Sequence, residues 1–127
     1  MVTSSLLEAE KRLLGLISQS KKLYKMSSAH IKAEEFATDV YRRLAKSMYD
    51  SYENGMSPDP AMMLNDFSGD DLSEASEVFY NLEVYSGDEE TVKELLYTIK
   101  LEKLNMHINA ETDPTNLMDL FKPVSYT

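Results

Sequence analysis

The residues that could bind a metal ion or act as a nucleophile are few in this sequence. There is no cysteine, and the two histidines are His30 and His107. Neither histidine belongs to the Glu-x-x-His pair with which helical bundles hold two iron ions. We therefore expect no metal site, and we expect His107 to lie on an exposed helix face near a helix end.

Other catalytic patterns are also missing. The four glycines stand alone at positions 15, 55, 69 and 87, so no glycine-rich phosphate loop is present. No serine sits in a nucleophile elbow. The carboxylate pairs Glu34-Glu35, Asp70-Asp71 and Glu89-Glu90 fall at expected helix starts or turns, where the helix dipole stabilises them without catalysis. The sequence predicts no catalytic residue and no cofactor, which indicates a binding module and not an enzyme.

The net charge of −9 is unevenly distributed along the chain. Residues 1–50 carry nine Lys/Arg against six Asp/Glu (+3), residues 51–90 carry none against eleven (−11), and residues 91–127 carry four against five (−1). An acidic middle third repels a phosphate backbone, so we expect no direct nucleic-acid binding. The acidic face is either simply solvated or the docking surface for a basic protein.

The sequence shows no signal for membrane insertion or secretion. No apolar run approaches the roughly 20 residues that span a bilayer, and the N-terminus lacks the apolar core of a signal peptide. With no cysteine, the chain needs no oxidising compartment. We expect a soluble, cytoplasmic protein without a membrane partner.

Apolar residues recur at helical spacing along most of the chain, and no segment alternates as a strand does. Helix starts are marked by Ser5 with Glu8, by Thr38, by Asp59-Pro60 and by Ser86 with Glu89. Expected helices cover 5–18, 21–26, 39–54, 60–67, 72–82, 88–108 and a short 116–121. The fold class is therefore all-α, a bundle of six or seven helices. Its core should include Leu72, Phe79, Leu96 and Ile99.

The stretch Asp88–Ile108 organises the rest, because its apolar side changes over near Lys100. Val92, Leu95, Leu96 and Ile99 form one stripe, and Tyr97, Leu101, Leu104 and Ile108 form another roughly 160° away. The first half should belong to a bundle core and the second half should pair with something else. The alternative is one long helix sandwiched on both sides within a single bundle.

This pattern predicts two parts. Residues 1–103 form a bundle and residues 104–127 form a second, C-terminal part, and the two share the helix 88–108. The C-terminus ends in a short apolar segment, Asn116–Phe121, which Pro123 breaks. We interpret Val124–Thr127 as a truncation or a cloning scar.

A series of core patterns recurs in a fixed order. It runs Ala9-Glu10-x-x-Leu13-Leu14, Phe36, Tyr41-Arg42-x-Leu44-Ala45, Tyr52-Glu53-x-Gly55, Asp59-Pro60-Ala61-x-x-Leu64, Ala75-Ser76-x-x-Phe79 and Ile99-Lys100-Leu101-x-Lys103. Together these patterns resemble the C-terminal helicase-binding domain of bacterial DNA primase of the DnaG type, over roughly residues 6–108. The resemblance implies a helical bundle followed by a helical hairpin, joined by a long shared helix. It thus implies that residues 104–127 form a partial helical hairpin or tail.

The resemblance also implies a function. In that family the domain binds the N-terminal domain of the hexameric replicative helicase, couples primer synthesis to unwinding, and carries no catalytic residue of the primase. By this analogy the helicase contact falls on the hairpin. The partner-binding residues would be Lys100, Lys103, Leu104, His107, Ile108, Leu117, Leu120 and Phe121.

Two other readings remain open. The N-terminal domain of the replicative helicase resembles the primase domain in fold, so the chain could be that domain instead. A free-standing helical adaptor or regulator would dock through the acidic face of residues 51–90. What lies upstream in the gene would discriminate these possibilities, because a primase would carry a zinc finger and a polymerase region there.

Overall fold

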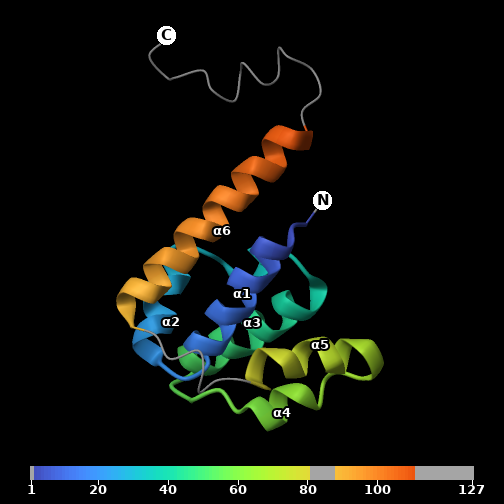
Figure 1. Ribbon diagram of the computed structural model, residues 1–127. Coiled ribbons are helices and arrows are strands. Elements are labelled where there is room, and N and C mark those ends of the chain that lie inside the picture. The colour runs from blue at the N-terminus through green and yellow to red at the C-terminus, as the bar shows by residue number, and fades with distance from the viewer. Residues whose placement is uncertain (1, 81–87, 111–127) are drawn as a thin grey trace.

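The computed structural model describes the backbone of residues 2–80 and 88–110, with side chains up to residue 107. Within these residues the chain is helical and contains no strand, which confirms the all-α bundle (Figure 1). The elements are α1 (Ser4–Ile17), α2 (Lys21–Ser28), the 3-10 turn η1 (Ala33–Glu35), α3 (Asp39–Glu53), α4 (Pro60–Leu64), α5 (Gly69–Tyr80) and α6 (Glu89–Ala110).

Polar side chains cap the helix starts largely as the sequence predicts. The Thr38 hydroxyl accepts the Tyr41 amide at 3.0 Å, and Asp59 Oδ1 accepts the Ala61 amide at 3.0 Å just before Pro60. Gly55 follows the end of α3 with φ at +72°, a left-handed conformation that favours glycine. Local chemistry therefore fixes both ends of α3.

The cap of α1 differs from the prediction. The helix begins after Thr3, whose hydroxyl accepts the Leu6 amide at 3.1 Å, and Ser5 lies inside the first turn. Thr3 also donates a hydrogen bond to Glu102 Oε2 of α6 at 3.2 Å. Thr3 is hydrogen-bonded to both α1 and α6. This contact with a distant helix explains why Thr3, and neither Ser4 nor Ser5, caps α1. Glu8 pairs with Lys11 instead of a capping serine.

The predicted cap of the last helix, Ser86, lies outside the described residues. Asp88 takes the capping position, since its Oδ1 accepts the Thr91 amide at 3.2 Å. Glu89 forms an ion pair with Lys22 of α2. The start of α6 is thus held both by its own cap and by a neighbouring helix.

Helix α1 lies at the centre of the bundle and packs against α6, α2, α5 and α3. Its Leu13, Leu14 and Ile17 side chains are completely buried. Val92, Leu95, Leu96 and Ile99 of α6 cover it from one side, and the pairing of α1 with α6 is the most extensive in the bundle. The predicted first stripe of α6, which includes Leu96 and Ile99, is confirmed as core.

Three tyrosines join α2 to α3 and to the end of α1. The Tyr24 ring stacks on Tyr52 at 4.6 Å and meets Tyr49 edge-on at 5.0 Å. The Tyr49 hydroxyl donates to the Ile31 carbonyl at 2.8 Å, and the Tyr52 hydroxyl donates to the Ile17 carbonyl at 2.6 Å. Each of these two phenols therefore buries its ring and still satisfies its polar end.

Helix α5 buries only part of the face that the sequence predicts. Ala75, which belongs to a predicted core pattern, is completely buried together with Val78, whereas Leu72 is 37% exposed and Phe79 is only partly buried. Leu82, the last residue of the predicted helix 72–82, lies outside the described residues. Two small residues let α5 approach α1 and α3 closely, and the bulky side chains then fall on its flanks. The prediction that Leu72 is core was wrong.

Helix α6 is one continuous helix whose second half projects beyond the other helices (Figure 1). Its first half supplies the buried stripe, and the bundle leaves Tyr97, Leu101 and Leu104 exposed. In the described part of the chain these residues are not sandwiched, as the single-bundle alternative would require. None of the described helices has an apolar stretch long enough to span a bilayer.

Candidate functional site

An apolar stripe of three large side chains lies on the outer face of α6. Tyr97 is 68% exposed, Leu101 is 42% exposed and Leu104 is 47% exposed. At about 100° per residue they share one face, opposite the face of Val92 and Ile99. Exposed apolar residues are common singly, but a contiguous group on a projecting helix is typical of a protein-interaction surface. We call these three residues the α6 stripe.

The opposite side and one edge of the same half-helix are held to the bundle by polar contacts. Lys103 Nζ donates a hydrogen bond to the Glu35 carbonyl, and Lys100 Nζ lies 3.3 Å from Nδ1 of His30. Glu102 accepts the bond from Thr3 described above. These polar contacts fix the direction in which α6 projects, and so they fix where the α6 stripe points.

The predicted partner-binding residues are only partly within the described chain. Leu104 is on the α6 stripe, and His107 is exposed near the end of α6, as expected. Lys100 and Lys103 lie on the edge that faces the bundle. The side chain of Ile108 and the whole of Leu117, Leu120 and Phe121 lie outside the described residues. Their role in partner binding stays a prediction.

Two members of the α6 stripe were absent from the predicted partner-binding set. Tyr97 and Leu101 are exposed on the same face as Leu104. The sequence held the signal for both, because the second apolar stripe already contained them. The family analogy placed the contact from Lys100 onward, which left Tyr97 out, and Leu101 was not chosen among the residues within that range.

A clamp of charged side chains holds the backbone of the turn that leads into α3. Lys103 of α6 binds the Glu35 carbonyl, Arg42 of α3 donates to the Phe36 carbonyl at 3.1 Å, and Glu10 of α1 accepts the Ala37 amide at 2.8 Å. Three helices thus bind three consecutive residues of one turn. Phe36 itself is 1% exposed, so the same turn is anchored in the core.

Glu10 is the buried charge of this clamp. Its side chain is completely buried, and Oε2 has no hydrogen-bond partner among the described residues. Burial raises the pKa of the Glu10 carboxyl, because a low-dielectric interior disfavours its charged form. The Ala37 amide and the nearby charges of Lys103 and Arg42 act in the opposite direction and are smaller.

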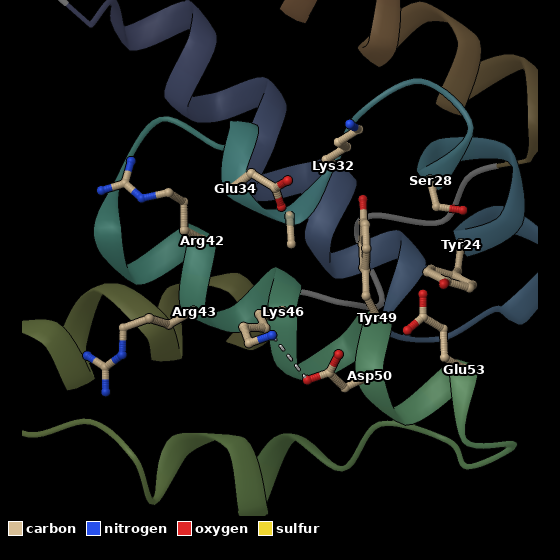
Figure 2. A pocket seen from close by; sticks show the side chains of 11 residues that line it. Tyr24, Ser28, Lys32, Glu34, Arg42, Arg43, Lys46, Tyr49, Asp50 and Glu53 are labelled. Carbon is tan, nitrogen blue, oxygen red and sulfur yellow. Dashed lines mark ion pairs between the residues drawn. The ribbon is translucent and has the colours of Figure 1, made fainter.

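A groove of about 510 Å³ runs between α2, η1 and α3 (Figure 2). Tyr24 and Tyr49 lie at its base, and residues of both charges surround it. Most of the cations are already engaged: Lys46 pairs with Asp50 at 3.7 Å, and Arg42 binds the Phe36 carbonyl. The groove therefore presents balanced charge and no basic cluster for a phosphate.

Arg43, at one end of this groove, points away from it in Figure 2 and holds α4 and α5 instead. Its guanidinium donates to the Asp66 carbonyl at 2.7 Å and lies 4.3 Å from the centre of the Phe67 ring. Among the described residues, no group of three or more His, Asp or Glu side chains could hold a metal ion.

Comparison with known proteins identifies one family. The model of the DnaB-like helicase N terminal domain matches residues 2–101, which is most of the chain. No curated protein and no solved structure gave a significant match. The match covers all of α1 to α5 and the first half of α6.

The resemblance to the helicase-binding domain of DNA primase was wrong, since the family match is to the helicase side. The quoted patterns are positions such as Leu13, Leu44 and Ala75, which are all completely buried. Such positions report a helical bundle and carry no information about its partner. The matched family is a non-catalytic helical domain of DNA replication, and nothing supports a fragment of a primase.

Proposed function

Because the chain belongs to the DnaB-like helicase N-terminal domain family, we propose that it is the N-terminal interaction domain of a replicative helicase. In this role it docks another replication protein and performs no chemistry itself. The observation that supports this proposal most directly is the α6 stripe, an uncovered apolar face on a helix that projects from a well-packed bundle.

The partner we propose is the helicase-binding domain of DNA primase, the domain that pairs with this family of helicase domains. The α6 stripe has the anatomy of an interface, with an apolar centre and the exposed charges Lys93, Glu94 and Lys100 around it. Tyr97 is the expected anchor, since tyrosine contributes strongly at the centre of interfaces. Contact at this surface would couple primer synthesis to unwinding.

Introducing a charge into the α6 stripe should weaken this contact. A carboxylate in place of Leu101 or Leu104 would have to be desolvated without a partner in the complex. We expect Leu101→Glu and Leu104→Glu each to weaken binding at least tenfold, which corresponds to about 1.4 kcal/mol. Titration calorimetry of the chain against the isolated primase domain measures this effect.

The matched control is Leu72→Glu, because Leu72 is an equally large and exposed leucine on α5. This variant should bind as the native chain does. Native affinity in both α6 variants would exclude the stripe as the primase surface. Sedimentation equilibrium separates a further outcome: a native dimer that the α6 variants dissociate would mean that a second copy covers the stripe.

We also propose that residues 1–103 form a bundle and that residues 104–127 form a separate hairpin-like part. The fully buried residues of α6 end at Ile99, and the Lys103 contact with Glu35 marks the last described hydrogen bond to the bundle. Beyond Lys103, Met106 is the one described apolar side chain that packs, partly buried, against the core. This arrangement supports the division.

Truncation after Lys103 tests the division. We expect the shortened chain to keep the helicity of the bundle and a cooperative thermal transition, with Tm within a few degrees of the native value, as for small stability changes in a domain of this size. Circular dichroism measures both. A loss of cooperative melting would show that residues beyond Lys103 belong to the same core.

A further inference from the structure

A pocket of about 310 Å³ opens between α1, the start of α3 and α5, on helices that do not carry the α6 stripe. Its wall includes the half-buried Leu7, and its polar lining includes the three carboxylates Glu8, Glu74 and Glu77 with the ammonium of Lys11. Three negative groups against one positive group leave a charge of −2. The pocket is therefore electronegative.

The carboxylates are not equally engaged. Glu8 pairs with Lys11 at 3.0 Å, and Glu74 Oε2 accepts the Thr38 hydroxyl at 2.9 Å. Glu77 is exposed and forms no ion pair with a described residue. The pocket thus retains one oxygen of Glu74 and both oxygens of Glu77 for a donor that comes from outside.

Tyr41 adds an unpaired hydroxyl to the pocket lining. The residue as a whole is 5% exposed, and its hydroxyl has no hydrogen-bond partner among the described residues. Of the described side-chain atoms, Glu10 Oε2 is the one that is both buried and unpaired, so the Tyr41 hydroxyl is not itself buried and stays accessible to an incoming donor. Burial raises the pKa of Tyr41, and the carboxylates Glu74, Glu10 and Glu77 raise it further, so the hydroxyl stays neutral beside this negative charge.

The arrangement does not suit a metal ion. In the part of the chain that the structure describes, no three acidic side chains or histidines converge closely enough for coordination. Separated acceptors fit a planar group with several donors better, because a guanidinium presents five N–H groups in a fixed fork.

We propose that this pocket binds the guanidinium group of an arginine side chain from a partner protein. The methylene stem packs along Leu7, as long basic side chains do on apolar surfaces. The head donates to Glu74 and Glu77 and to the oxygen of Tyr41. The proposal is independent of the primase contact, since it concerns α1, α3 and α5 and not the α6 stripe.

The experiment uses the full chain and a short acetylated, amidated peptide, Gly-Ser-Arg-Ser-Gly, followed by two-dimensional amide NMR. We expect saturable shifts of the Glu74 and Glu77 amides and of the Tyr41 ring, with a Kd on the order of 1 mM. The same peptide with citrulline, which keeps the shape of arginine and lacks its charge, should give no saturable shift. A lysine peptide should bind more weakly than the arginine peptide.

Substitutions test which side chains of the pocket bind the guanidinium. Glu77→Gln should weaken arginine binding about tenfold, as expected for loss of a hydrogen bond to a charged group. Tyr41→Phe should weaken it roughly two- to tenfold by removing one acceptor. The control Glu94→Gln removes an exposed carboxylate from α6 and should leave the affinity unchanged. Equal binding of citrulline, equal binding of lysine, or native affinity in Glu77→Gln would each overturn the proposal.

Discussion

Replacing Leu14 with alanine should lower the free energy of unfolding by about 2–5 kcal/mol, which is the usual cost of truncating a buried leucine. Leu14 is completely buried on α1, the helix that packs against four others. The cavity would therefore lie where several helices meet, and the surroundings could relax only partly. Urea denaturation followed by circular dichroism measures the difference.

Leu72→Ala is the control for this substitution. It removes the same atoms from a leucine that is 37% exposed on α5, and we expect a change within about 0.5 kcal/mol, as for most surface positions. If the two variants lost similar stability, the assignment of α1 as the centre of the core would be contradicted.

The variant Glu10→Gln should gain stability relative to the native chain as the pH rises from 4 to 8. The native carboxyl has a raised pKa in the folded state, so the folded chain holds this proton more tightly than the unfolded chain does. The resulting stability is fully present below the ordinary pKa of 4.5 and is lost as the pH passes through the folded pKa. Glutamine has no such proton and lacks this loss.

The measured quantity is the difference in free energy of unfolding between Glu10→Gln and the native chain at each pH. Other carboxyls titrate in both proteins and cancel in this difference. Leu72→Ala, which changes no ionisable group, should show a flat difference over the same range. A flat difference for Glu10→Gln as well would mean that the buried carboxyl does not titrate differently on folding.

Much of this fold follows from local chemistry that a single sequence displays. Thr38 and Asp59-Pro60 mark helix starts and act in the structure as predicted. Gly55 follows the end of α3 in the left-handed conformation that glycine favours, which is also a local feature. The change of apolar face along α6 is also visible, because helical spacing assigns Ile99 and Leu101 to opposite sides. These features depend on neighbouring residues alone.

Features that depend on contacts between helices could not be predicted in this way. Helix α5 turns Val78 inward beside the predicted Ala75, since small residues allow the closest approach to α1 and α3, whereas spacing alone favoured Leu72. Thr3 rather than Ser5 caps α1 because it also reaches Glu102, which is 99 residues away. Neither choice is encoded in the spacing of nearby residues.

The two candidate sites also differ in whether the sequence could predict them. The α6 stripe was predictable, because it is a periodic pattern on one helix. The arginine pocket was not, because Glu8, Tyr41 and Glu77 come from three helices and no spacing in the sequence relates them. The family assignment failed for a third reason: a pattern of core positions such as Leu44 and Ala75 describes a fold that two partner proteins have in common.

The clamp on residues 35–37 also bears on how the chain tolerates changes in length. Loops usually accept insertions because their backbone is solvated and makes few fixed contacts. In this turn Glu10, Arg42 and Lys103 each hold a different backbone group, so one added residue would misplace at least two of the three bonds. The exposed connection at Gly55–Ser57 is free of such contacts from distant helices. Homologues and engineered variants should therefore vary in length after α3 and keep a constant length before it.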